Sequence, residues 1–311
     1  MSTTPARAEA KVLAYLASQG GYDAIIARLE AGRARPEDRA TAANFIRRIL
    51  GGQDRDGSWN DRLVSTARAL LAVRELGAAA GIREVDPGVG RGLAWLKERQ
   101  GGPGRFGEGC DPARHRIGLC HHFLGGFFGL GPGAAEPMAL DHDGRIEDER
   151  SVRFAASALA LRAFLAWDAD STDLRLHLHG LRHVAELDEA AGIVPEAALM
   201  GLHTLIRAPS PSPAMRAAAV AAVDRLGRAQ RGDGSWSRVD VFHAVRVLLA
   251  AVERGVAAEK AGTPLGHAAR LLAATQQDDG GWGGESPARR ALIGWRALRA
   301  ARELERMEPQ P

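Results

Sequence analysis

Apolar residues recur along this chain at the three- and four-residue intervals of amphipathic helices. Six Ala- and Leu-rich stretches have this spacing, at residues 61–77, 114–130, 151–167, 195–207, 238–255 and 286–304. Further helical stretches precede most of them, at residues 36–50, 87–99, 213–228 and 264–275. These four begin with Pro, which is tolerated in a first helical turn because the N–H there has no partner within the helix. The pattern predicts an all-α protein built from two alternating sets of helices.

A short motif lies where the two sets meet. Gln, three residues, Gly, one residue and an aromatic residue occur in the copies Gln53–Gly57–Trp59, Gln100–Gly104–Phe106, Gln230–Gly234–Trp236 and Gln276–Gly280–Trp282. Two weaker copies, Leu140–Gly144–Ile146 and Asp188–Gly192–Val194, keep the central Gly. The six starting positions are 47, 40, 48, 42 and 46 residues apart, a period that fits two helices and two turns. We therefore expect six imperfect helix-pair repeats.

These repeats predict an α/α toroid, an α6/α6-type barrel with the six Ala-rich stretches as its inner helices. The toroid domain spans residues 36–311, and residues 1–35 form an N-terminal helical extension of one or two helices. The third repeat has too little chain between residues 131 and 140 for an outer helix. The extension is expected either to fill that gap or to provide a partner surface.

The motif itself is interpreted as a structural brace. Asp56, Asp233 and Asp279 stand directly before three of the glycines. Asp-Gly is a favourable turn sequence because Gly accepts positive φ. The Trp two residues later can then fold back over the seam between helix pairs. We expect these residues to hold the fold and to take no part in chemistry.

Composition excludes several classes of protein. The 41 Lys and Arg and 38 acidic residues are scattered, with a formal net charge of +3, so nucleic-acid binding is not expected. Two cysteines cannot provide a disulfide framework for 311 residues, which fits a reducing compartment. A signal-peptide layout and an apolar run of membrane-spanning length are both absent from the sequence. We expect a cytoplasmic protein, and peripheral membrane contact and the oligomeric state stay open.

The Gln-x-x-x-Gly-x-Trp copies resemble the QW motifs of squalene-hopene and oxidosqualene cyclases and their weaker relatives in protein prenyltransferase β subunits. The resemblance covers residues 37–304. It implies inner helices around a central cavity that receives an apolar or isoprenoid small molecule. It further implies an isoprenoid-handling enzyme, with acid-initiated, class II cyclisation of a polyene or prenyl substrate as the first reading. The alternatives are a zinc-dependent, prenyltransferase-like enzyme and a non-catalytic toroid that binds a lipid, peptide or protein, so Zn²⁺, Mg²⁺ and no metal all stay open.

Acid-initiated cyclisation needs a carboxylic acid that its neighbours keep protonated. The Asp-x-Asp-Asp motif of class II cyclases is absent. The nearest acidic run is Glu147, Asp148 and Glu149 at the start of the third inner helix, just after Asp141 and Asp143. An acidic run that opens a helix more often provides favourable end charge and capping.

The prenyltransferase alternative requires zinc ligands. The string from Asp240 to His243 at the start of the fifth inner helix resembles the Asp-x-x-His that contains the zinc-binding His of that family. No Asp-x-Cys accompanies it in a neighbouring repeat. Because Cys120 belongs to the second repeat, about half a ring away, one zinc site shared by Cys120 and His243 is not expected.

The second repeat holds the densest group of reactive side chains, all within thirteen residues: Cys110, Asp111, His115, Cys120, His121 and His122. His115 with His122, and Cys110 with Asp111, could converge on a metal or an acid–base pair. The common spacings of structural zinc sites are absent, and histidines at a cavity edge often only form hydrogen bonds. Phe123 and Phe127 follow as an aromatic patch suited to a hydrocarbon, and Arg114 and Arg116 could meet a diphosphate.

Overall fold

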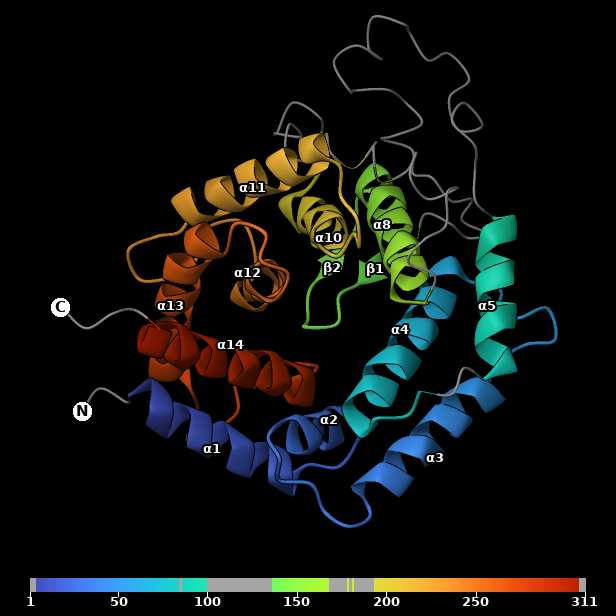
Figure 1. Cartoon of the computed structure of the whole chain (residues 1–311), viewed down its shortest axis with the longest axis horizontal. Helices are drawn as coiled ribbons and strands as arrows, with labels where there is room; N and C mark the ends of the chain where they lie inside the picture. Colours follow the sequence, from blue (N-terminus) through green and yellow to red (C-terminus); the bar gives the residue numbers. More distant parts are fainter. Residues whose placement is uncertain are drawn as a thin grey trace, which may run out of the picture. The chain divides into compact units, whose positions relative to one another are not determined.

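The computed structural model describes residues 4–83, 86–99, 136–167, 178, 181 and 193–307. Within these residues the chain forms eleven helices and one two-stranded hairpin (Figure 1). The all-α prediction is thus confirmed for the described part of the chain. The described residues divide into two compact units, a first unit drawn from residues 1–35, 139–144 and 219–311 and a second unit drawn from residues 36–138 and 145–218.

The first unit is centred on one long helix. Its helices are α1 (Pro5–Ser18), α2 (Tyr22–Glu30), the end of α11 (Pro213–Arg228), α12 (Val241–Glu253), α13 (Ala258–Thr275) and α14 (Pro287–Met307). Helix α14 packs against α1, α2, α12 and α13, as Figure 1 shows. The fully buried side chains of the first unit include Trp295, Phe242, Leu16 and Ile26.

The second unit is arranged around α4 and α8. Its helices are α3 (Asp38–Gly51), α4 (Leu63–Ala80), α5 (Pro87–Glu98), α8 (Glu149–Trp167), α10 (Pro195–Ile206) and the start of α11. Helix α4 packs on α3, α5 and α8, and α8 packs on α10. The Thr204 hydroxyl donates to the Ala158 carbonyl (2.9 Å) and so joins α10 to α8. The many small side chains of α8 permit this close approach.

Most predicted helices are found within two or three residues of their expected ends. The expected inner helices at 61–77, 151–167, 195–207, 238–255 and 286–304 are α4, α8, α10, α12 and α14, while 114–130 lies outside the described residues. The expected outer helices at 36–50, 87–99 and 213–228 are α3, α5 and α11. The expected start at Pro264 was wrong, because α13 begins at Ala258 and buries Ala261 completely before it reaches Pro264.

Three Gln–Gly–Trp segments share one hydrogen-bond pattern. The Gln side chain donates to the carbonyl of its own Gly, at 2.9 Å for Gln53, 3.0 Å for Gln230 and 2.9 Å for Gln276. It also donates to a carbonyl of a second helix: Gly88 (2.8 Å), Pro264 (2.9 Å) and Ala8 (3.1 Å) respectively. The Trp indole donates back to the preceding helix, at Ile49, Leu226 and Leu272. These are the contacts of a brace between helices.

The glycine of each segment cannot carry a side chain. Gly57, Gly234 and Gly280 have φ values of +96°, +90° and +98°. A Cβ atom at each would lie 2.5 Å from a carbonyl oxygen of the helix that the Gln also contacts. Only Gly meets both conditions, since L-residues rarely adopt this conformation.

The N-terminal helix α1 receives the third brace. Gln276 donates to Ala8, and Gly280 lies against the Lys11 carbonyl, as Gln230 and Gly234 do with Pro264 and His267 of α13. Helix α1 therefore has, beside the Gln276 brace, the place that α13 has beside the Gln230 brace.

The weak copy at residues 140–146 forms a hairpin, which the helical pattern did not predict. Its strands are β1 (Met138–Ala139) and β2 (Arg145–Ile146), and the Leu140 N–H donates to the Gly144 carbonyl (2.9 Å). Gly144 has φ of +86°, so the predicted glycine turn is present. The copies beginning at 100 and 188 lie outside the described residues, apart from Val194 before α10. Among the described helices, none combines the length and the apolar character that crossing a bilayer requires.

Candidate metal centre

The structure places five of the candidate residues. The others lie outside the described residues: Cys110, Asp111, Arg114, His115, Arg116, Cys120, His121, His122, Phe123 and Phe127. The placed candidates fall into two groups, the acidic run before α8 and the residues at the start of α12. These groups differ in burial and in what they contact.

The acidic run before α8 makes the contacts of a helix start. Glu147, Asp148 and Glu149 are all exposed. The Asp148 carboxylate accepts from the Ser151 N–H (2.8 Å), and Glu149 pairs with Arg153 one turn later (2.8 Å). A carboxylate that accepts from a free N–H of the first turn stabilises that helix end. The contacts match the capping alternative raised from the sequence.

Asp240 fixes the start of α12. Its side chain accepts from the Phe242 N–H (2.8 Å), as expected of an Asp at the N-cap. The cap sets the first turn of α12, where Phe242 and His243 are both buried. His243 is thereby held in the interior by the local sequence Asp-Val-Phe-His.

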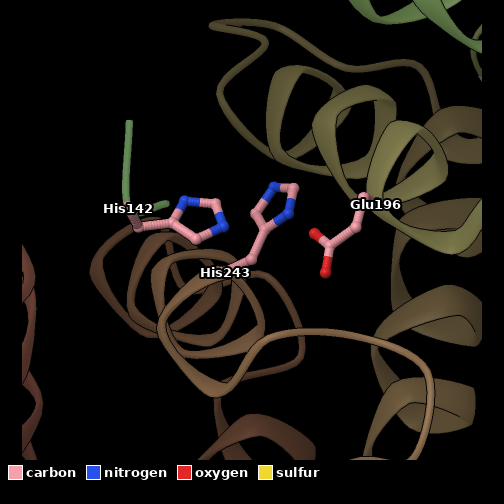
Figure 2. A group of neighbouring side chains, drawn as sticks. All are labelled: His142, Glu196 and His243. Carbon is pink, nitrogen blue, oxygen red and sulfur yellow. The ribbon is translucent and has the colours of Figure 1, made fainter. Parts of the chain in front are cut away.

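A second histidine meets His243 from a distant part of the chain. His142 lies in the turn between β1 and β2, is 1% exposed, and belongs to the first unit as His243 does. The two ring centroids are 4.7 Å apart and the rings are tilted by 43° (Figure 2). The third side chain drawn in Figure 2, Glu196 of α10, comes from the second unit.

Both nitrogens of the His142 ring are buried without a hydrogen-bond partner among the described residues. A buried polar atom in a folded protein nearly always has a partner. Leaving a polar group unsatisfied costs roughly 1–3 kcal/mol, so an imidazole in this state indicates a ligand or a special role.

Charged neighbours hold the hairpin turn in place. Asp141 pairs with Arg246 of α12 (3.2 Å), and Asp143 pairs with Arg290 of α14 (3.0 Å). The Asp143 carboxylate also accepts from the Ser286 N–H (2.7 Å) at the start of α14. His142 thus stands between two anchored carboxylates.

Burial lowers the pKa of His142 to about 2. The neighbouring His243 and Arg246 lower this pKa further, and Asp141 opposes them. His142 is therefore a neutral imidazole at physiological pH, with a ring lone pair available. A neutral imidazole is the form in which histidine binds a metal ion.

Sequence reasoning singled out His243 but not His142. The signal for His142 was a His between two Asp at the glycine turn of the weak copy, where other copies carry no histidine. Its meaning depends on the packing of that turn against α12, which the sequence does not show.

Comparison with known proteins returned nothing similar: a scan against protein-family models and a search of curated proteins both gave no match to this chain. The observations above define a helical protein with a buried histidine pair. Its function has to be inferred from those residues.

Proposed function

We propose that this protein is a zinc-dependent enzyme and that His142 and His243 are ligands of its metal ion. We further propose that its helix pairs form a toroid. The observation that carries the proposal is the buried pair of imidazoles, one of which has two nitrogens without a partner. Zn²⁺ binds imidazole nitrogen at about 2.0–2.1 Å, so two rings in contact can share one ion. A divalent ion bound to one nitrogen of the His142 ring would give that nitrogen the partner it lacks.

The chemistry of the ligands favours zinc over magnesium. Imidazole suits Zn²⁺ and the neighbouring transition metals, whereas Mg²⁺ prefers oxygen ligands in an octahedral arrangement. A zinc ion with two imidazole ligands needs further ligands, and in catalytic sites one of these is water or substrate. Such an ion lowers the pKa of a bound thiol or water and makes a nucleophile at neutral pH.

A toroid is supported by the common geometry of the three braces. Each brace ties one helix pair to a further helix through the same Gln, Gly and Trp contacts. If every helix pair is joined to the next by the same contacts, each pair is rotated by the same amount relative to its neighbour. In closed folds this constant rotation produces a ring. The resemblance to QW motifs adds an apolar or isoprenoid substrate to this proposal.

Among the enzyme alternatives, zinc-dependent transfer agrees better with the geometry than acid-initiated cyclisation. The acidic run is exposed and engaged as a cap, whereas the histidine pair is buried and includes His243, the His of the Asp-x-x-His string. In the proposed reaction the sulfur of a substrate thiolate forms a bond to the allylic carbon of a prenyl diphosphate. The carbon–oxygen bond breaks as it forms, diphosphate leaves with the electron pair, and the thiol proton has already passed to solvent.

The first test is metal binding. Tag-free protein is stripped with a chelator, dialysed against Zn²⁺, and analysed by elemental mass spectrometry alongside His142→Ala and His243→Ala. We expect about one zinc per chain in the wild type and a loss of affinity of at least roughly tenfold in each variant. His267→Ala, a histidine on α13, is the matched control and should bind as the wild type does.

Two results would refute the proposal. One is a wild-type protein that takes up no zinc, and the other is uptake that both site variants retain. Cys110→Ser and Cys120→Ser belong in the same series, because zinc lost only in these variants would move the metal to the second repeat. With zinc in place, release of diphosphate from prenyl diphosphates in the presence of a thiol peptide tests the transfer itself, and a cyclised polyene would favour the cyclase alternative.

A further inference from the structure

We propose that Arg290 is a positioning residue of the metal centre, which fixes the separation of the two histidines before a metal binds. This inference rests on the proposed function. The Arg290 guanidinium lies 3.0 Å from the Asp143 carboxylate and 3.6 Å from the Asp240 carboxylate. One of these acids is the residue after His142, and the other is the cap of the turn that carries His243.

The contacts of Arg290 require an arginine. Its planar guanidinium can meet two carboxylates through different nitrogens, which the compact ammonium of Lys cannot do in the same geometry. The group also lies over the Phe242 ring, at 4.4 Å from the ring centroid. Its Nε is buried and has no hydrogen-bond partner among the described residues. Such an arrangement is costly for stability alone and is consistent with a role in a site.

Asp143, the partner of Arg290 on the hairpin, is itself closely held. Its carboxylate accepts from the Ser286 N–H (2.7 Å) and the Glu285 N–H (3.1 Å). Gly284 leaves the space for it, because a Cβ there would lie 1.9 Å from the carboxylate oxygen. Asp143 has φ of +82°, a left-handed conformation that costs energy in a non-Gly residue. The start of α14 thus fixes the residue next to His142.

These contacts together connect the two histidines through α14. The connection runs from the hairpin turn through Asp143 to Arg290, and from Arg290 to the Asp240 cap of α12. A ligand pair that is already in place loses less freedom when the ion binds. Loss of the connection is therefore expected to weaken metal binding although both ligands are still present. The separate pair of Asp141 with Arg246 keeps the hairpin attached, so the effect should be partial.

The test compares variants of α14 in the full chain. Arg290→Met keeps the aliphatic stem and removes the guanidinium, and Arg290→Lys keeps the charge. Arg299→Met is the matched control, because Arg299 lies on the same helix and pairs with exposed Glu303. Zn²⁺ affinity is measured by competition with a chromophoric chelator, and the visible spectrum of bound Co²⁺ reports ligand geometry.

We expect Arg290→Met to weaken Zn²⁺ binding by roughly 10- to 100-fold, the range seen when outer-shell partners of metal ligands are removed. The Co²⁺ spectrum should change with it, Arg290→Lys should recover part of the affinity, and Arg299→Met should change neither quantity. A folded Arg290→Met protein with wild-type affinity and spectrum would overturn the inference. If Arg290→Met does not fold, Asp143→Asn provides the same test, since Asn keeps one acceptor oxygen for the N–H groups at the start of α14 and loses the charge pair.

The two proposals fail in different ways. Retention of zinc by both His142→Ala and His243→Ala refutes the metal centre itself. Loss of zinc in those variants with full retention in Arg290→Met and Asp143→Asn refutes only the positioning role.

Discussion

The buried state of His142 predicts how the stability of the metal-free protein depends on pH. Burial holds the pKa of His142 at about 2 in the folded protein, whereas an exposed histidine has a pKa of about 6.5. Between these values the unfolded chain binds a proton that the folded protein does not. His142 therefore contributes stability that is fully present above the unfolded pKa and is lost progressively as the pH falls toward the folded pKa.

The size of this effect follows from linkage. The free energy of unfolding changes by about 1.4 kcal/mol per pH unit for each proton taken up on unfolding. The loss begins near the unfolded pKa, so lowering the pH from about 8 to about 5 should cost roughly 2 kcal/mol through His142 alone. That is a large share of the roughly 5–15 kcal/mol that stabilises a typical domain.

The assay is urea unfolding of chelator-treated protein at both pH values, with His142→Leu beside the wild type. Leu has no proton to bind, and the His142 ring has no hydrogen bond to lose, so the variant should be at least as stable at the higher pH. Carboxylates titrate in both proteins, and the difference between the two pH dependences isolates His142.

Equal losses of stability in the wild type and in His142→Leu would refute the reasoning. The result would mean that His142 is already protonated or solvated in the folded protein. A neutral, buried ligand would then be excluded, and with it the basis for zinc binding at this place.

Further predictions concern the braces and the packing of α10. Gly234→Ala should destabilise the protein by roughly 2 kcal/mol more than Gly255→Ala. Both glycines have positive φ, but only at Gly234 would the added Cβ lie 2.5 Å from a carbonyl oxygen. Chemical denaturation of the two variants measures the difference. Gln230→Leu removes the donor to two carbonyls and should cost roughly 1–3 kcal/mol in the same assay, with faster amide exchange at the start of the α11–α12 loop. Thr204→Val removes a buried hydroxyl bond between α10 and α8 and should lower the unfolding free energy by about 1 kcal/mol, whereas unchanged stability would show that this bond adds nothing net.

Local signals in the sequence predicted the helices well. The stretch 213–228 was predicted with the bounds that α11 has, because Pro marks its first turn and the Gln–Gly–Trp motif follows its end. The local part of the motif was predictable for a similar reason, since the Gln contact with its own Gly and the Trp contact with the preceding helix both act within ten residues. The second acceptor of the Gln lies on a more distant helix, α5, α13 or α1. The start of α13 was missed because buried Ala261 extends the helix before Pro264, and propensity alone does not register that burial.

The site could be predicted only in part. His243 could be named as a candidate because its cap and its spacing are local, whereas His142 lies 101 residues earlier in the chain. Two such residues meet only through tertiary packing, here through Asp141, Asp143 and the start of α14. The place of α1 was also hidden, since no motif in its own sequence names Gln276 as its partner.

Because α1 packs beside the Gln276 brace, the order of the helices in space differs from their order in the chain. In the first unit α13 is the second partner of the Gln230 segment and α1 is the second partner of the Gln276 segment, although α1 comes first in sequence. A circularly permuted protein that carries α1 and α2 after α14 would therefore keep the contacts of α1 with α13 and α14. Deletion of residues 1–18, in contrast, would take from Gln276 its second acceptor and expose the face of α14 that α1 covers.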